Sequence, residues 1–389
     1  MIKKILLLSP FFYFVILPFI HIPGLIDPYE LPKVLFFISF TFILIGLYVW
    51  RMLTYKTAFV KFQKTHFFIL SIIIIYTISS IINSSLSISF FGQYFRYQGL
   101  ITQVSYFLFF VLFTNLEGIG LTNTRLAKNI ALGGLFLSFL IITQAFIYKI
   151  LLIPIYNYNG RLAGFLGNPN FAGGFLTLSF IYLSFSPFKK IPLVFSWLIF
   201  FSALLLTDSR SAIITFLFVS IVLFIGKVNK KVFLVPVFLL FALIIFLVAL
   251  SRPVSTFENR TVIWNKAISA SLEKPIFGWG LDNFAVAFQS VLGPNDFDLK
   301  KIRVDKTHNE FLEILLSGGI LALLIYILIL LDTIKTLWKN RKDAWPKTNL
   351  LALIAFLILA QFNVLNITEY IFFYLILSTV VSKTNSSTL

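Results

Sequence analysis

Four arginines and one histidine stand at the edges of long apolar runs, where their side chains could bind an anionic substrate. Arg96 lies in FGQYFRYQGL, Arg161 in NGRLAGFLGNPNFAGG, Arg210 in LTDSRSA, Arg260 in ENRTVIW and His308 in RVDKTHNEFLEILLSGG. An arginine presents a planar fork that pairs with two phosphate oxygens and does not deprotonate in proteins. Several arginines at one membrane depth would suit a diphosphate, whereas each of them alone could simply anchor the chain to lipid phosphate.

His308 adds a group that can change protonation near neutral pH, because the unperturbed pKa of imidazole is about 6.5. A neutral histidine close to a hydroxyl can take its proton as a general base. Glu310 or Glu313 could orient the imidazole or compensate its charge, and we place Asn309 and Glu310 among the substrate-binding residues. Without chemistry, His308 would be the start of a helix, capped by Thr307 or Asn309.

The stretch Asn168-Pro169-Asn170 predicts a turn that leads into a helix, with Asn170 as its N-cap. The free N–H groups of such a helix start can bind an anion. We therefore expect Asn168 and Asn170 to contact substrate together with Arg161, although a simple cap would need no ligand.

A metal site has little support in the sequence. Asp296-Phe297-Asp298 resembles the Asp-x-Asp pair that holds a divalent ion in sugar-nucleotide enzymes, but a pattern this short often arises by chance. Asp27 and Glu30 are a weaker alternative. The chain has no cysteine, which excludes disulfides, thiolate metal sites and cysteine nucleophiles. We expect neither a metal nor another cofactor.

The elements that must position these residues are membrane helices. Of the 389 residues, 59% are hydrophobic and only 12% are charged, against about a quarter in soluble proteins. Apolar runs near the ~20 residues that a spanning helix needs follow one another along the chain. The net charge of +17 is scattered between these runs, which argues against nucleic-acid binding. The first run resembles a signal peptide but lacks a small-residue cleavage site, so we expect it to stay as the first helix.

The fold class predicted is an all-α polytopic membrane protein of about twelve spans, of which the last two could form a re-entrant pair. The spans lie near 5–23, 32–50, 67–83, 99–116, 129–150, 170–186, 190–207, 211–226, 232–250, 310–334, 349–365 and 367–382. With the N-terminus inside, short cytoplasmic segments hold 19 basic residues and short outward loops hold five. This asymmetry predicts that both termini are cytoplasmic.

We divide the chain into helices one to nine (1–250), a large outward loop (251–308) and helices ten to twelve with a short cytoplasmic tail (309–389). In the loop, ENRTVIWNKAISASLEKPIFGWG predicts an amphipathic helix that ends before Pro275. Gly278-Trp279-Gly280 predicts a turn, and a second short helix is expected from Phe284 to Leu292.

Taken in order, RLAGFLGNPNFAGG, TDSRSA, NRTVIWNKAISASLEKPIFGWGLDNF and THNEFLEILLSGG resemble the O-antigen ligase and O-antigen polymerase superfamily, as do DPYELPK and RYQGL upstream. The resemblance implies a metal-independent, inverting glycosyltransferase of the bacterial plasma (inner) membrane. Such an enzyme moves a glycan from undecaprenyl diphosphate to an acceptor hydroxyl at the outer face. It also implies that Arg210 and Arg260 hold the diphosphate and that His308 activates the acceptor. Arg161 lies in the matching upstream motif, and Arg96 is a looser match.

The partners implied are the lipid-linked glycan donor, a saccharide or lipid-linked saccharide acceptor and the lipid bilayer. Lipid A core, another repeat unit and a protein side chain all remain open as acceptors. A transporter or flippase of a lipid-linked or anionic substrate is the alternative function, and a structural scaffold is a third. Transporters usually carry ionisable groups near the membrane midplane. The outward charges here sit at helix ends, which favours a surface site.

Overall fold

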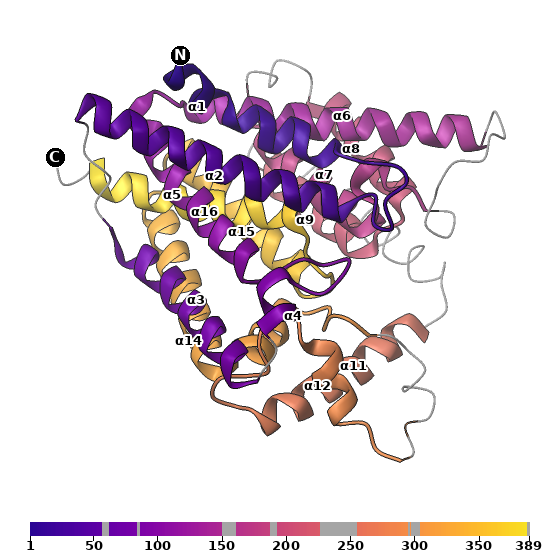
Figure 1. Cartoon of the computed structure of the whole chain (residues 1–389). Coiled ribbons are helices and arrows are strands. Elements are labelled where there is room, and N and C mark those ends of the chain that lie inside the picture. Colours follow the sequence, from indigo (N-terminus) through magenta and orange to yellow (C-terminus); the bar gives the residue numbers. More distant parts are fainter. Residues whose placement is uncertain are drawn as a thin grey trace.

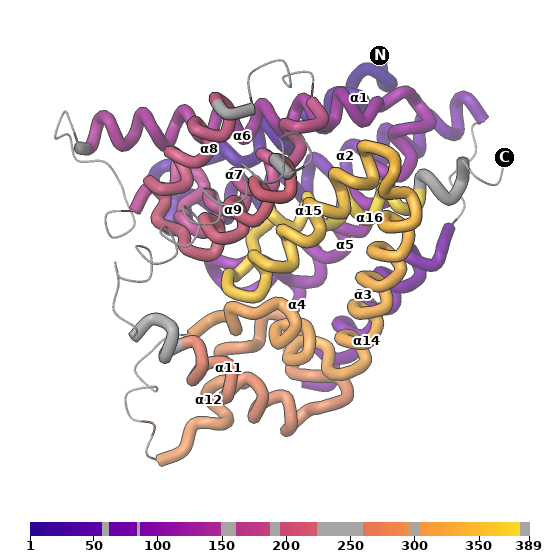
Figure 2. Tube along the Cα trace, turned by 180° about the vertical axis from the view of Figure 1, so that it is seen from behind, coloured from indigo at the N-terminus to yellow at the C-terminus, as the bar shows by residue number. Residues whose placement is uncertain are grey.

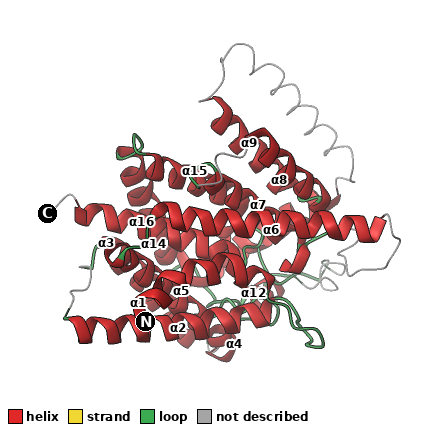
Figure 3. Ribbon diagram, turned by 90° about the horizontal axis from the view of Figure 1, so that it is seen from above, coloured by secondary structure: helices red, strands yellow, loops and turns green. Residues whose placement is uncertain are grey.

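The structure, a computed structural model, describes residues 1–56, 62–83, 86–149, 161–186, 193–225, 255–294, 296 and 304–386. The regular elements of these residues are helices, with no strand among them (Figure 3). The longer helices are α1 (Ile2–Phe11), α2 (Glu30–Tyr55), α3 (Lys64–Ile82), α5 (Leu100–Leu116), α6 (Asn123–Lys149), α7 (Pro169–Leu183), α8 (Leu193–Thr207), α9 (Arg210–Ile225), α11 (Ser255–Glu273), α14 (Glu310–Lys339), α15 (Ala344–Ala360) and α16 (Ile367–Ser386). The short helices are α4 (Leu86–Phe91) and α12 (Phe284–Ser290), and α1 continues through a π-helical turn (Phe12–Ile16) and a 3₁₀ turn (Leu17–Phe19).

Six helical segments among the described residues are long and apolar enough to cross a membrane. They are Ile2–Phe19, Glu30–Tyr55, Lys64–Ile82, Leu100–Ile119, Asn123–Tyr148 and Glu310–Lys339. Four apolar segments are shorter, namely Phe195–Thr207, Arg210–Leu223, Ala344–Ala360 and Ile367–Val381. This composition fits a polytopic membrane protein.

The predicted number of twelve spans is not confirmed. The predicted span 232–250 lies outside the described residues. Helices α7 and α8 have 15 residues each, which at 1.5 Å per residue is about 22 Å. That length is short of a hydrocarbon core of about 30 Å. Hydropathy located these helices in the sequence but did not establish that each one crosses the bilayer.

Helix α7 lies at the centre of the bundle. All of its residues except Asn170 are buried, and it packs against α6, α8, α9, α15 and α16. Gly173 brings its backbone close to the side chains of Ser209 and Ala212 near the start of α9, and Gly174 approaches Glu369 of α16 in the same way. Small residues allow such close packing in membrane helices. The start of α7 therefore lies directly beside the start of α9.

The predicted span 310–334 is not one continuous helix. α14 breaks at Gly319, where φ is 66° and ψ is −167°. The turn that follows α11 fills this break: Trp279 N donates to Leu316 O (2.6 Å) and Gly280 N donates to Ser317 O (3.1 Å). The carbonyl groups of Leu316 and Ser317 therefore accept hydrogen bonds from a segment that is distant in the sequence, in place of bonds within α14.

The fit of this turn depends on Gly278. Its φ is +69°, and a Cβ added to it would lie 2.4 Å from Leu316 O and 2.7 Å from Gly319 N. Only glycine combines this conformation with so close an approach. The turn was predicted from Gly278 to Gly280; the structure has it slightly earlier, at 275–277, followed by a bend at Trp279.

The described part of the loop folds into the two predicted helices. α11 ends at Glu273, before Pro275, and α12 runs from Phe284 to Ser290. The two helices share a small apolar core that includes Ala267, Ala270 and Phe288, and both pack against α14. In Figures 1 and 2 this unit lies at one end of the molecule, away from the N-terminus. It carries Arg260 to the start of α14.

Candidate active site

Arg210 and Arg260 come together from distant parts of the chain. Arg210 begins α9, and its Nε and Nη2 atoms are buried with no hydrogen-bond partner among the described residues. Burial lowers the pKa of Arg260, on α11, and the positive charge of Arg210 lowers it further. Both side chains are guanidinium cations. Two like charges at one partly buried place would be stabilised by an anion between them.

His308 is held in the left-handed region, at φ 56°, immediately before the helix. Thr307 Oγ1 donates to Asn309 O (2.7 Å) and accepts from Asn309 N (3.2 Å), while Asn309 Oδ1 accepts from Leu312 N (3.1 Å). Trp264 of α11 donates to Thr307 O (3.0 Å). Asn309 is therefore the N-cap of α14, and the imidazole takes no part in the cap. A non-glycine residue with positive φ costs about 1–3 kcal/mol and occurs most often at functional sites.

The imidazole of His308 lies in a positively charged environment. Its Nδ1 is buried and meets no partner within the described ranges. Burial lowers the pKa of His308 to about 4, helped by the charges of Arg260 and Arg96 and opposed by Asp305. The side chain is consequently neutral at pH 7, the state that can accept a proton.

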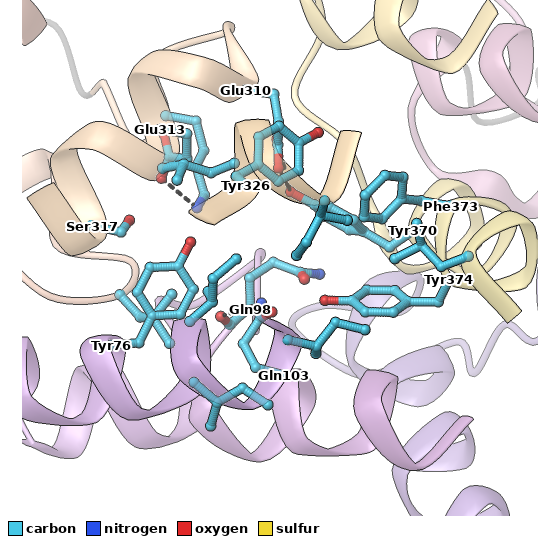
Figure 4. A pocket seen from close by; sticks show the side chains of 18 residues that line it. Tyr76, Gln98, Gln103, Glu310, Glu313, Ser317, Tyr326, Tyr370, Phe373 and Tyr374 are labelled. Atoms are coloured by element: carbon cyan, nitrogen blue, oxygen red, sulfur yellow. Dashed lines mark hydrogen bonds and ion pairs between the residues drawn. The ribbon is translucent and has the colours of Figure 1, made fainter. Parts of the chain in front are cut away.

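Neither Glu310 nor Glu313 orients His308, contrary to the prediction from sequence. Tyr370 Oη donates to both carboxylate oxygens of Glu310, each at 2.9 Å. Glu313 accepts from Lys306 Nζ at 2.7 Å. Both carboxylates are thus engaged away from the imidazole, and the side chain of Glu310 lines a neighbouring cavity of about 60 Å³ (Figure 4).

The carboxylate that acts on His308 belongs to Asp305, which the sequence analysis missed. Asp305 Oδ2 accepts from Arg96 Nε at 2.8 Å. Burial raises the pKa of Asp305, but the charge and hydrogen bond of Arg96, together with the charges of Lys306 and His308, outweigh burial and hold this pKa below its ordinary value. Arg96 is therefore already paired, and the pair stands beside the imidazole. The position of Asp305 three residues before His308 was the available signal.

Arg161, Asn168 and Asn170 hold the turn that precedes Arg210. Asn168, not Asn170, is the N-cap of α7, because Asn168 Oδ1 accepts from Asn170 N at 2.9 Å. The prediction of Asn170 as the cap is wrong. Asn170 Oδ1 instead accepts from Arg161 Nη2 and from Ser209 Oγ, both at 3.0 Å. These bonds tie the start of α7 to the residue before Arg210, which gives Arg161 and Asn170 a positioning role.

Asn363, in the turn between α15 and α16, is a second residue that the sequence analysis missed. Its Oδ1 accepts from Ser211 Oγ at 2.9 Å, which places it next to Arg210. Its Nδ2 is buried and has no acceptor in the part of the chain that the structure describes. Asn363, His308 and Asn309 line one small crevice. An amide between two apolar runs, in QFNVLN, was the only sequence signal.

The described residues contain no cluster of three or more His, Cys, Asp or Glu side chains that could hold a metal ion. Asp296 binds Lys266 Nζ at 2.6 Å, and its predicted companion Asp298 lies outside these residues. Of the alternative pair, Asp27 caps the start of α2 by accepting from Glu30 N at 3.0 Å.

The candidate site thus combines two partly buried guanidinium groups with a neutral histidine in an apolar helical bundle. Residues 195–327 match the family model described as "O-Antigen ligase", and this range contains Arg210, Arg260 and His308. The "ComP-specific O-oligosaccharyltransferase" of Acinetobacter baylyi is 30% identical over 247 residues, which cover 56% of this chain and 42% of that protein. The chain thus spans less than half the length of this curated relative. These matches confirm the predicted resemblance: the chain is similar to O-antigen ligases and to this O-oligosaccharyltransferase.

Proposed function

We propose that the protein is a membrane glycosyltransferase that moves a glycan from undecaprenyl diphosphate to an acceptor hydroxyl. The observation that carries this proposal is the partly buried guanidinium of Arg210, whose Nε and Nη2 atoms are buried and lack a partner among the described residues, close to Arg260. A diphosphate would supply the missing acceptors and neutralise both charges. Guanidinium–phosphate hydrogen bonds are among the stronger ones in proteins.

In the proposed reaction, the acceptor oxygen attacks the anomeric carbon of the donor sugar while the imidazole of His308 takes the hydroxyl proton. The bond between the anomeric carbon and the diphosphate oxygen breaks, and lipid diphosphate leaves with the electron pair. Arg210 and Arg260 stabilise the charge that develops on this leaving group. A single displacement inverts the anomeric configuration. No step requires a metal.

The low pKa of His308 would change when donor binds. Arg260 and Arg96 are two of the causes that hold this pKa at about 4. A bound diphosphate cancels positive charge next to the imidazole and therefore raises its basicity. The histidine would become an effective base only after the anionic donor has bound, which protects the acceptor from unproductive deprotonation.

The reaction would take place at the predicted outward face of the bacterial plasma membrane, with both termini cytoplasmic. The relative named above is described as an O-oligosaccharyltransferase, which supports transfer of an oligosaccharide to an acceptor hydroxyl; a protein side chain is one candidate acceptor. Lipid A core and a second repeat unit remain equally compatible with the site. Both ligase and polymerase versions of the reaction use the same arginines and histidine.

A transporter is the second candidate function, because α14 is interrupted at Gly319 within its apolar stretch and broken helices are common in transporters. The backbone groups exposed by this break are bonded to the turn after α11. They are therefore not available to a passing substrate, which favours the enzyme.

The test uses purified protein, undecaprenyl-diphosphate oligosaccharide, a panel of the three acceptor kinds and a chelator. We expect glycosylated acceptor and free lipid diphosphate in equal amounts from the wild type. His308→Ala should lose transfer, whereas His21→Ala, which removes a histidine outside the site, should keep it. Binding of the donor without any cleavage, against every acceptor, would favour the transporter instead.

A further inference from the structure

The start of α2 carries two charged side chains, Glu30 and Lys33, that lie inside the helical bundle. They belong to the segment DPYELPK, residues 27–33. Lys33 is 0% exposed and Glu30 is 7% exposed, and their spacing places them on one face of the helix, one turn apart. A buried charge is costly unless hydrogen bonds compensate it. The contacts of these two side chains therefore decide what they do.

Lys33 holds the turn that precedes α7. Its Nζ donates to Tyr29 O at 2.9 Å and to Phe165 O at 2.8 Å. Phe165 is the middle residue of the 3₁₀ turn Gly164–Leu166. The side chain of Tyr29 packs directly on the next residue, because a Cβ added to Gly167 would lie 2.7 Å from Tyr29 Cβ. The start of α2 thus fixes the backbone of this turn by a hydrogen bond and by packing.

Glu30 holds the turn that precedes α16. Its Oε1 accepts from Asn366 Nδ2 at 3.2 Å. Asn366 stands immediately before α16, and its Oδ1 accepts from Thr368 N at 3.1 Å and from Thr368 Oγ1 at 2.8 Å. An amide side chain has its donor and its acceptor on opposite sides. The bond to Glu30 therefore also orients the oxygen that caps the first turn of α16.

Both turns lead to Arg210. The first turn continues to Asn170, whose Oδ1 accepts from Ser209 Oγ at 3.0 Å. The second turn contains Asn363, whose Oδ1 accepts from Ser211 Oγ at 2.9 Å. Ser209 and Ser211 are the neighbours of Arg210 in the sequence. Two separate turns therefore hold Arg210 from both sides, and the start of α2 contacts both of them.

Neither side chain suits direct binding of an anion. Lys33 has no exposed surface, and two of its three N–H groups already donate to backbone carbonyl groups. The carboxylate of Glu30 would repel a phosphate group. Arg210, in contrast, has Nε and Nη2 without a partner among the described residues. Any effect of Glu30 and Lys33 on an anionic substrate would therefore pass through the position of Arg210.

We propose that Glu30 and Lys33 are positioning residues, which hold the turns before α7 and α16 so that the guanidinium of Arg210 is fixed before the donor binds. The proposal rests on the proposed function for the identity of that donor. A group that is already ordered loses less conformational entropy on binding. Loss of either contact should therefore weaken binding of the donor and leave binding of the acceptor unchanged.

The kinetic test compares Lys33→Met and Glu30→Leu, which remove the two contacts, with Glu30→Gln, which keeps an oxygen that can accept from Asn366. Lys4→Met, at an exposed position, is the matched control. The first two variants should raise the donor KM by about 2- to 10-fold, the equivalent of one hydrogen bond, without a change in the acceptor KM. Glu30→Gln and Lys4→Met should keep both values. A lower kcat with both KM values unchanged would overturn the proposal, because it would indicate only a smaller folded fraction.

Hydrogen exchange of the unliganded protein separates this proposal from the proposed function. Exchange of the amides in residues 207–216 should be about 2- to 10-fold faster in Lys33→Met and Glu30→Leu than in the wild type and Lys4→Met, with α3 unchanged. This result would support the positioning role even if the wild type transfers no glycan. If Lys33→Met does not fold, Glu30→Leu, which removes a single side-chain bond, decides the outcome. Unchanged exchange in residues 207–216, or an equal rise in every helix, would overturn the proposal.

Discussion

Replacing Arg210 with methionine should raise stability and remove activity at the same time. Methionine keeps an unbranched, flexible side chain but has no guanidinium. In the unliganded protein, Nε and Nη2 of Arg210 are buried without a described partner. An unsatisfied buried polar group costs about 1–3 kcal/mol, and the repulsion from Arg260 adds to this cost. We therefore expect Arg210→Met to increase the free energy of unfolding by about 1–3 kcal/mol.

The effect on activity has the opposite sign because the same two nitrogen atoms, Nε and Nη2, would each donate to the donor diphosphate. A hydrogen bond to a charged group contributes about 1.5–3 kcal/mol, so two contribute about 3–6 kcal/mol. At about 1.4 kcal/mol for each factor of ten, kcat/KM for the donor should fall by about 10² to 10⁴.

The assay combines thermal unfolding in detergent with initial rates at varied donor concentration. Arg341→Met, at an exposed position after α14, is the matched control and should change neither quantity. A lower Tm for Arg210→Met would mean that the guanidinium is satisfied in the unliganded protein. A kcat/KM within about threefold of wild type would mean that Arg210 does not bind the donor. Either result would refute the reasoning.

Three further predictions follow from the site and its supports. Because the His308 pKa lies near 4 and the neutral form is the base, donor kcat/KM should fall only as the pH drops toward 4. Asp305→Asn should move this acidic fall in kcat/KM to lower pH, because the carboxylate of Asp305 raises the pKa of His308. A fall in the wild-type kcat/KM centred near pH 6.5 would contradict the assignment of His308 as the base. Gly278→Ala should abolish transfer by displacing the turn from α14. Gly293→Ala is the control and should keep transfer, because its Cβ would meet no atom closer than 3.7 Å. Equal activity of the two variants would show that the turn does not support the site. Asn170→Ala should lower the free energy of unfolding by about 1–3 kcal/mol through two lost hydrogen bonds and raise the donor KM, and an unchanged Tm would argue against the positioning role.

Hydropathy and glycine spacing predicted much of the fold. The apolar runs located the long helices, and the amphipathic pattern placed α11 and its end before Pro275. The break in α14 was not predicted, although Ser317-Gly318-Gly319 interrupts the apolar run at this point. The segment that fills the break could not be predicted, because Trp279 N donates to Leu316 O across a long separation in the sequence.

The site was predictable where residue type alone carries the chemistry. Arginines at the ends of apolar runs made Arg210 and Arg260 candidates, and a histidine just before a predicted helix made His308 a candidate. The partners were not predictable, because they depend on tertiary contacts. Asp305 was overlooked in favour of two glutamates that bind elsewhere, and Asn363 reaches the site from the turn before α16.

The cavity that Glu310 lines was also hidden in the sequence. Tyr76, Tyr326 and Tyr374 each stand in an apolar run, where an aromatic residue normally indicates a packed core. Only the pairing of α3 with α14, across from α5 and α16, brings these hydroxyls to one space.

The central claim is that an acceptor hydroxyl, assisted by His308, displaces lipid diphosphate in one step. The anomeric configuration of the product tests it most directly. Purified wild-type protein would be given undecaprenyl-diphosphate oligosaccharide of known configuration and an acceptor, and the product linkage would be read by NMR. We predict an inverted linkage, formed by the wild type and not by His308→Ala. A retained configuration, or the same inverted product at the wild-type rate from His308→Ala, would contradict this account.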